Sequence, residues 1–246
     1  MLQENTFQRP AVRDEIHVSE AMTISGTAAA AVVLLIVLVV AGSIGWVLVD
    51  PVPPHGEAAP PPAWLVPVVL AAAGLALWSG FRPHVSPLAA PAYAALEGLA
   101  LGAVSHTYEV ASDGIVLQAI GATVAVLLVQ LVLHASGLVR ATPRFLEVLF
   151  AAGLATILLY GVVLTAHAIG FSATFLGTEA HVVVSLISAG VAAFFLFADF
   201  HVIEEGARHR APKYMEWYAA LGLVLTLVWL YLELLALMGD DDGGGD

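Results

Sequence analysis

The feature that most constrains this chain is a series of long apolar segments separated by short polar connectors. The first is a run of 23 residues, Thr27 to Val49, without a charged side chain. A helix needs about 20 apolar residues to cross a bilayer core. Seven segments come close to this length: 27–49, 63–81, 86–108, 115–134, 146–169, 181–201 and 217–238. Lipid offers no partners to an open backbone, so all seven are predicted to be helices.

The sequence therefore predicts an all-α integral membrane protein with seven transmembrane helices. Residues 1–26 are expected to form a cytoplasmic segment, residues 27–239 the membrane domain and residues 240–246 an acidic disordered tail. Only 11% of the residues are charged, against about 25% in soluble domains. Cysteine is absent, which excludes disulfides and thiolate metal sites. A net charge of -12 makes nucleic acid an improbable partner.

The basic residues predict the topology. Basic residues near helix ends are retained on the cytoplasmic side. With seven helices, all eight of them fall on one side of the membrane: Arg9, Arg13, Arg82, Arg140, Arg144, Arg208, Arg210 and Lys213. We therefore expect a multi-pass protein of the plasma membrane, with its N-terminus in the cytoplasm and its C-terminus outside.

Three carboxylates within the apolar segments, Glu97, Asp199 and Glu233, are the main candidate functional residues. An ionised acid at a helix centre costs about 2.5–3.5 kcal/mol on insertion scales, and protonating a glutamate at pH 7 costs about 3.7 kcal/mol. Because the two costs are close, such groups suit a proton-responsive gate. A rise of 1.5 Å per residue places Asp199 roughly 5 Å, Glu97 roughly 15 Å and Glu233 roughly 20–25 Å from the cytoplasmic face.

The last apolar segment carries a polar stripe. Gly222, Thr226, Trp229 and Glu233 follow the i, i+4, i+7, i+11 spacing of one helix face. We expect this stripe to face the interior of the bundle, with the three carboxylates on a common path. Nearer the outer end of the third segment, His106 and Glu109 are candidate residues of an outer mouth.

These polar residues also have structural interpretations. Asp199 is near a predicted helix end, where it could cap the helix or extend to the interface. Glu97 and Glu233 could be protonated donors between helices. The histidines near helix ends, including His106 and His134, are more typical of interfacial positions than of metal sites.

Three stretches resemble the Bax inhibitor-1 family and are most similar to its prokaryotic branch. They are ADFHVIEEGARHRAPKYMEWYAALGLVLTLVWLYLE at 198–233, APAYAALEGLALGAVSHTYE at 90–109 and SGLVRATPRF at 136–145. The resemblance covers nearly the whole chain. It implies a seven-helix bundle with the last helix surrounded by the other six, and a pH-sensitive calcium leak.

In bacterial members of this family, two aspartates on the sixth and seventh helices are thought to sense protons and hold the pore closed. By this resemblance, Asp199 corresponds to the first. The position of the second falls near Thr226, where this chain has no carboxylate. Glu233 lies two turns beyond, about 10 Å away, so a direct bond between Asp199 and Glu233 is not expected. Glu216 is another candidate partner.

Calcium sites usually contain six to eight oxygen ligands. Acids that lie roughly 5–10 Å apart from one another in depth cannot form one such cage, and they suit the successive weak sites that conduction requires. Asp199 and Glu233 are therefore candidate weak calcium ligands, with transient calcium and no resident cofactor. The predicted function is a pH-sensitive calcium or cation leak channel or transporter, and not an enzyme.

The sequence also has features of two other classes of membrane protein. An intramembrane metalloprotease would use a pair of glutamates with a following arginine, and Glu204, Glu205 and Arg208 approach that pattern with the arginine one residue short. Zinc would also need three clustered ligands, and the histidines are scattered along the chain. A non-conducting membrane scaffold that binds partner proteins stays open as the main alternative.

Overall fold

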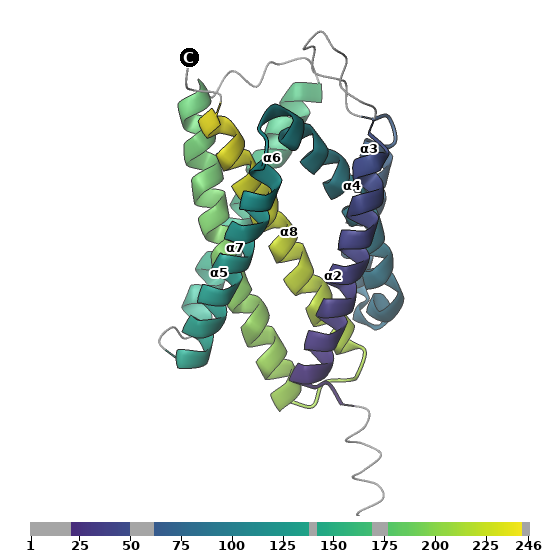
Figure 1. Cartoon of the computed structure of the whole chain (residues 1–246). Helices are drawn as coiled ribbons and strands as arrows, with labels where there is room; N and C mark the ends of the chain where they lie inside the picture. The colour runs from purple at the N-terminus through teal and green to yellow at the C-terminus, as the bar shows by residue number, and fades with distance from the viewer. Residues whose placement is uncertain (1–20, 50–61, 138–141, 169–176, 243–246) are drawn as a thin grey trace, which may run out of the picture.

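In the computed structural model, the described residues are 21–49, 62–137, 142–168 and 177–242. This part of the chain is helical, apart from one isolated β-bridge between Ala21 and Pro212. The elements are α2 (Ile24–Val47), α3 (Leu65–Phe81), the 3-10 helix η1 (Pro83–Val85), α4 (Ser86–Ala111), α5 (Ile115–Ser136), α6 (Pro143–Ala168), α7 (Gly177–Arg208) and α8 (Met215–Asp242). Figure 1 shows the helices side by side in one elongated bundle.

Each of the seven predicted apolar segments forms an α-helix, and six of these helices are long and apolar enough to cross a membrane. The protein is therefore an all-helical, multi-pass membrane protein. The exception is α3, an apolar helix of 17 residues. It is about 25 Å long at 1.5 Å per residue, shorter than a bilayer core of about 30 Å. A seventh crossing at α3 stays a prediction.

Two helix ends differ from the sequence-based expectation. The sixth apolar segment was expected to end at residue 201, but α7 continues to Arg208. Ion pairs from Glu205 to Arg208 and to His209 link successive turns of this extension, and such i, i+3 and i, i+4 pairs support an exposed helix. At the other end of the chain, α8 runs to Asp242, inside the predicted tail. The rest of that tail, 243–246, and the segment 1–20 lie outside the described residues.

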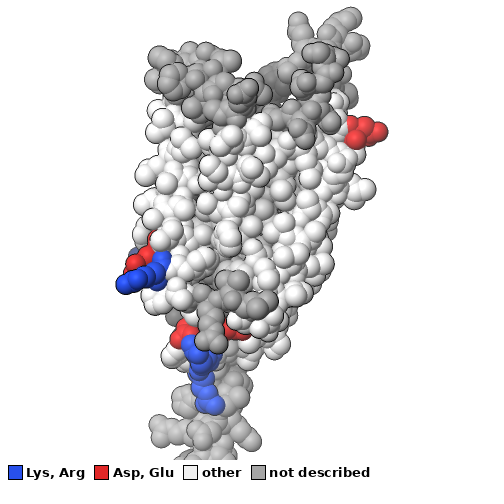
Figure 2. Space-filling view, turned by 90° about the vertical axis from the view of Figure 1, so that its left-hand side faces the viewer, with Lys and Arg blue, Asp and Glu red and all other residues white. Residues whose placement is uncertain are grey.

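The outer surface of the bundle is apolar. Leu77 of α3, Leu128 of α5 and Ile157 of α6 are each more than half exposed. A soluble monomer rarely exposes large contiguous apolar areas, whereas lipid tails solvate such side chains without cost. In Figure 2, the Lys and Arg side chains visible on this face lie in its lower half, and the surface between them and the upper edge is almost free of charge.

Small residues allow α2 and α4 to pack closely. A side chain added at Gly98 would collide with the carbonyl oxygen of Leu38, and one added at Gly102 would collide with that of Gly42. Without a hydrophobic drive in lipid, such close packing of small residues is a main source of helix association. Ala94, Gly98 and Gly102 follow a four-residue spacing, which places these small residues on one face of α4.

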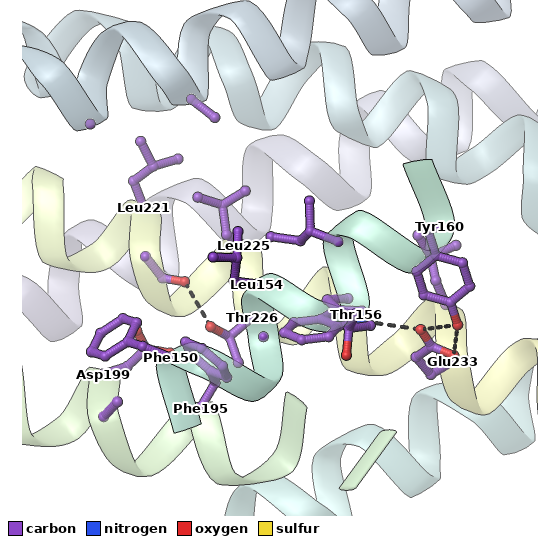
Figure 3. A pocket seen from close by; sticks show the side chains of 18 of the residues that line it. Phe150, Leu154, Thr156, Tyr160, Phe195, Asp199, Leu221, Leu225, Thr226 and Glu233 are labelled. Carbon is purple, nitrogen blue, oxygen red and sulfur yellow. Dashed lines mark hydrogen bonds between the residues drawn. The ribbon is translucent and has the colours of Figure 1, made fainter. Parts of the chain in front are cut away.

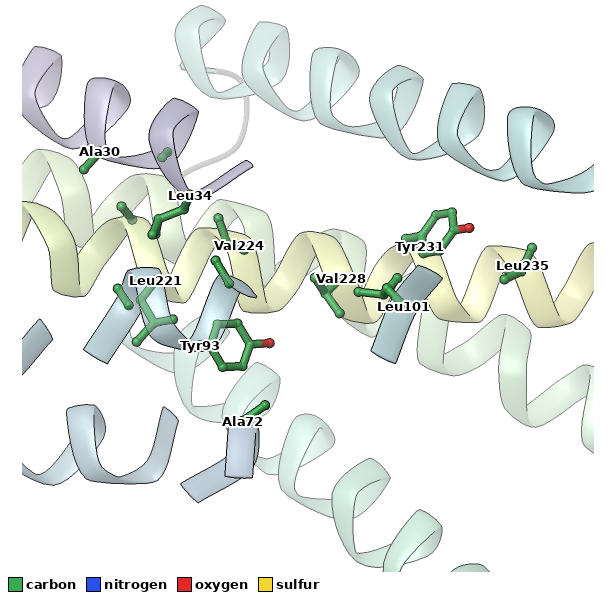
Figure 4. Packing of buried hydrophobic residues seen from close by; sticks show 14 of the residues in the cluster. Ala30, Leu34, Ala72, Tyr93, Leu101, Leu221, Val224, Val228, Tyr231 and Leu235 are labelled. Carbon is green, nitrogen blue, oxygen red and sulfur yellow. The ribbon is translucent and has the colours of Figure 1, made fainter. Parts of the chain in front are cut away.

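Helix α8 contributes most of the buried core. From Met215 to Gly239 none of its described side chains is exposed, and it contacts α2, α3, α4, α5 and α7. Its apolar residues Leu221, Val224 and Val228 belong to one buried cluster with Leu34 of α2 and Tyr93 of α4 (Figure 4). Another side of α8 carries Gly222, Thr226, Trp229 and Glu233, and this side lines the candidate site.

Candidate functional site: an intramembrane cavity with two carboxylates

A cavity of about 1030 Å³ lies between α8 and parts of α3, α4, α6 and α7. Most of its lining is apolar, including Phe150 and Leu154 of α6 and Phe195 of α7 (Figure 3). Its polar groups come mainly from α6, α7 and α8: Thr156, Tyr160, Ser185, Asp199, Tyr218, Thr226, Trp229 and Glu233. No Lys, Arg or His is among the described residues that line it. The cavity thus holds acids without a compensating base.

The polar stripe predicted on the last helix lies on this cavity. Gly222, Thr226, Trp229 and Glu233 all line it. They share one face because residues spaced at i, i+4, i+7 and i+11 point in nearly the same direction from a helix. Local helix geometry therefore suffices to place them together.

Asp199 enters the cavity from α7. A β-carbon built on Gly222 would lie 3.4 Å from its Oδ1, and Thr226, one turn further along α8, lies beside it. The Thr226 hydroxyl donates to the carbonyl of Gly222 at 3.2 Å. Asp199 Oδ2 is buried and has no hydrogen-bond partner among the described residues. This oxygen is available to a proton, a cation or another ligand.

Glu233 differs from Asp199 because its carboxylate is surrounded by donors. The Tyr160 hydroxyl of α6 lies 2.8 Å from Oε1 and 2.9 Å from Oε2, and the Ser188 hydroxyl of α7 donates to Oε1 at 2.5 Å. Trp229 Nε1 donates to the same oxygen at 3.0 Å. Glu233 is 5% exposed and links three helices. Satisfied polar contacts of this kind stabilise an acid that would otherwise be costly in the membrane.

No hydrogen bond joins Asp199 to Glu233 within the described residues. The neighbour of Asp199 on α8 is Thr226, seven residues before Glu233, and this separation is about 10 Å along the helix. The position on α8 next to Asp199 is therefore occupied by a hydroxyl. α7 also continues nine residues beyond Asp199 to Arg208, which puts this acid further from the helix end than the sequence indicated.

Glu97 does not belong to this cavity. It is partly buried on α4, beside Tyr93, and is absent from the residues that line the cavity. No hydrogen bond to its carboxylate occurs in the described part of the chain. The cavity therefore contains two of the three acids that the sequence placed on a common path.

His106 and Glu109, the two candidate residues of an outer mouth, form contacts with neighbouring parts of the bundle near the end of α4. The His106 ring contacts Trp46 edge-on, with 5.2 Å between centroids, and its Nδ1 is buried without a partner in the described ranges. Glu109 accepts hydrogen bonds from the backbone amides of Gly114 at 2.8 Å and Val116 at 3.0 Å. It thus satisfies free amides at the start of α5, and neither residue lines the cavity.

Glu216 ties the start of α8 to the start of α2. Its Oε1 accepts from the Thr23 amide at 2.9 Å, the Thr23 hydroxyl at 2.8 Å and Lys213 Nζ at 2.9 Å. The Met22 amide donates to the Ala211 carbonyl at 2.7 Å beside this contact. Glu216 lies ten residues before Thr226, about 15 Å along α8, so the structure gives it a different neighbourhood from Asp199.

Three interacting residues were not found by sequence reasoning. Tyr160 and Ser188 were missed as partners of Glu233, because each is one of several polar residues in a mostly apolar helix and its spacing does not distinguish it from the others. The third is Glu204, which pairs through Oε1 with His134 Nε2 of α5 at 3.0 Å while it stays 56% exposed. The side chains of His167 and His181 lie outside the described residues.

The described residues contain no group of three His, Cys, Asp or Glu side chains able to hold a metal ion. The three-ligand zinc site that a metalloprotease needs is therefore not present in this part of the chain. Asp199 and Glu233 are too far apart for a shared calcium cage of six to eight oxygens. At most, each carboxylate could contact a passing cation by itself.

Fold and site together define a multi-pass helical membrane protein with an acidic internal cavity. The sequence matches the family model described as Bax inhibitor 1 like over residues 3–240. Because this match covers nearly the whole chain, the protein belongs to the Bax inhibitor 1 like family. A search of curated proteins found no match.

Proposed function

We propose that this protein is a pH-sensitive leak channel or transporter for calcium and related cations. One observation carries the proposal: two carboxylates, Asp199 and Glu233, line a single cavity within the membrane domain. Acids are expensive in lipid and are functional by default when they face an internal cavity. The Bax inhibitor 1 like family supports the same function, because the sequence resemblance to it implies a pH-sensitive calcium leak.

In this proposal the two acids have different roles. Asp199 has a buried oxygen without a partner in the described ranges, so it is the group that binds a proton or a cation. Glu233 is held by Tyr160, Ser188 and Trp229, so it forms a fixed second site further along α8. Conduction requires sites that bind weakly enough to release the ion, and two separated carboxylates meet that requirement.

The proposal extends to the arrangement in the membrane. We propose that α8 is the central helix, which its lack of exposed side chains supports, and that α3 provides a seventh crossing. The basic residues near helix ends support the further proposal that the N-terminus is in the cytoplasm and the C-terminus outside the cell membrane. Lipid, protons and cations are the proposed partners, and no enzymatic activity is proposed.

Flux in liposomes tests the proposal. Purified protein should pass calcium into vesicles loaded with a calcium-sensitive dye, with a rate that varies between pH 5 and 8. Asp199→Asn should change this pH response. Glu97→Gln is the matched control, because it neutralises an intramembrane acid outside the cavity, and it should leave the response unchanged. A calcium flux that is absent, or identical at all pH values in wild type and Asp199→Asn, would exclude the proposed gate.

A non-conducting scaffold is the second candidate, and the saturated environment of Glu233 favours it. A carboxylate with three donors from three helices can hold these helices together through hydrogen bonds and so stabilise a binding surface elsewhere on the bundle. A scaffold predicts no calcium flux at any pH, with specific capture of a partner protein that survives Asp199→Asn. Flux with a pH response dependent on Asp199 would instead exclude a purely structural role.

A further inference from the structure

The cavity has a second property that ion leakage does not require: it is large and mostly apolar, and one of its walls, α6, is loosely packed. Within the described residues, the backbone of α6 contacts α7 but neither α3 nor α4. Phe150, Leu154 and Ile157 of α6 line the cavity and are each more than half exposed. These side chains are therefore not covered by packing, and α6 is the most loosely attached wall of the cavity.

The dimensions and lining are those of a site for a small organic molecule. Ligand pockets typically have volumes of about 300–1,000 Å³ and apolar walls with a few polar groups. This cavity has about 1030 Å³, and its walls include the aromatic rings of Phe150, Phe195 and Trp229. The Phe195 ring contacts Phe150 at 5.5 Å and Trp229 at 5.7 Å between centroids. A hydrated calcium ion binds oxygen ligands, so it does not require such an aromatic surface.

The acidic side chains of the cavity favour a ligand with a positive charge. Within the described residues, Asp199 Oδ2 is buried without a partner, and no basic side chain lines the cavity. Aromatic faces also attract cations through their quadrupole, most strongly where water is excluded. An acid and three aromatic rings in an apolar chamber complement a positive charge that carries its own apolar groups.

We propose that this cavity binds lipophilic organic cations, which enter from the membrane between α6 and α3 and place their charge next to Asp199. Glu233 contributes less, because its oxygens already accept hydrogen bonds from Tyr160, Ser188 and Trp229. The inference rests on the cavity and not on calcium conduction, so the two can fail separately.

The test compares two ions of the same shape and opposite charge. Radiolabelled tetraphenylphosphonium, a lipophilic cation, and tetraphenylborate, its anionic counterpart, are dialysed against the full-length protein in detergent micelles, with empty micelles as the blank. We expect saturable binding of the cation alone. Asp199→Asn should weaken it about tenfold or more, as expected for the loss of a charged partner. Glu97→Gln should bind like wild type. Equal binding of both ions, or unchanged binding by Asp199→Asn, overturns the proposal.

A second measurement does not depend on the folding of any variant. A photoactivatable triphenylphosphonium derivative is crosslinked to the native protein, and the labelled peptides are identified by mass spectrometry. Labelling should occur between residues 150 and 160 of α6 and between residues 222 and 233 of α8, and excess tetraphenylphosphonium should suppress it. Labels confined to the lipid-facing surface of α2 would overturn the proposal.

Discussion

Asp199 of α7 and Glu233 of α8 line the same cavity, yet they have opposite hydrogen-bonding states. Glu233 accepts hydrogen bonds from side chains of three helices, whereas Asp199 keeps a buried oxygen without a partner in the described residues. Both acids lie in an apolar environment where an unsatisfied polar group is costly. The difference indicates that Glu233 contributes to the stability of the bundle and that Asp199 is the more reactive group.

Removing one donor from Glu233 should destabilise the bundle. Ser188 is 1% exposed and connects α7 to α8 through Glu233 Oε1 and Trp229 Nε1. Ser188→Ala should lower the free energy of unfolding in detergent by about 1 kcal/mol, the usual size of a hydrogen bond between membrane helices. Ser43→Ala is the control, because the exposed Ser43 bonds only the Val39 carbonyl of its own helix. Equal stability of the two variants would contradict the role given to Ser188.

Glu216 should control the attachment of α2 to α8. Glu216→Ala removes the acceptor of the Thr23 amide and hydroxyl, and an unsatisfied donor of this kind costs about 1–3 kcal/mol. Hydrogen exchange should therefore accelerate in the first turn of α2, and thermal unfolding should shift to lower temperature. The exposed Glu147 of α6 supplies the control, since Glu147→Ala should alter neither quantity. Unchanged exchange at Thr23 in Glu216→Ala would refute this assignment.

The sequence was sufficient to predict the helices, because lipid permits little else to a long apolar segment. The ends of helices that continue beyond the apolar segments were less predictable. α7 extends to Arg208 through side-chain pairs such as Glu205 with Arg208, and a hydropathy pattern ends where the apolar residues end. Length also matters for α3, whose 17 residues leave its crossing undecided.

The site was predictable only along a single helix. The stripe from Gly222 to Glu233 follows from the helical period, which fixes side-chain directions within α8. Tyr160 and Ser188 could not be assigned in this way. Helices α6 and α7 are apolar on most faces, so the face that turns inward is set by packing against neighbours and leaves little trace in the local pattern. Glu97 is absent from the cavity for the same reason, since packing also sets which face of α4 is turned toward it.

Close packing of α2 and α4 should depend on Gly102. A methyl group at this position would collide with the backbone of Gly42, so Gly102→Ala requires the two helices to separate. We expect a loss of about 1–3 kcal/mol, typical of overpacking, measured by unfolding in detergent. Gly121→Ala of α5 is the matched control, because nothing lies within 4 Å of an added Cβ there. Gly121→Ala should be neutral or stabilising, and a similar loss in both variants would show that helix contact is not the cause.

Thr226 offers a gain-of-function test of the proposed gate. It lies beside Asp199, and by the family resemblance it is close to the position expected for a second aspartate. Thr226→Asp would put two carboxylates side by side, and such pairs share a proton because both cannot easily ionise together. The calcium flux should therefore depend more steeply on pH in Thr226→Asp than in wild type. Thr226→Asn, which has the same shape without the charge, is the control and should keep the wild-type profile. If both variants show the same pH profile in liposomes, Asp199 does not act through a neighbour at this position, and the gate must involve a different part of the cavity.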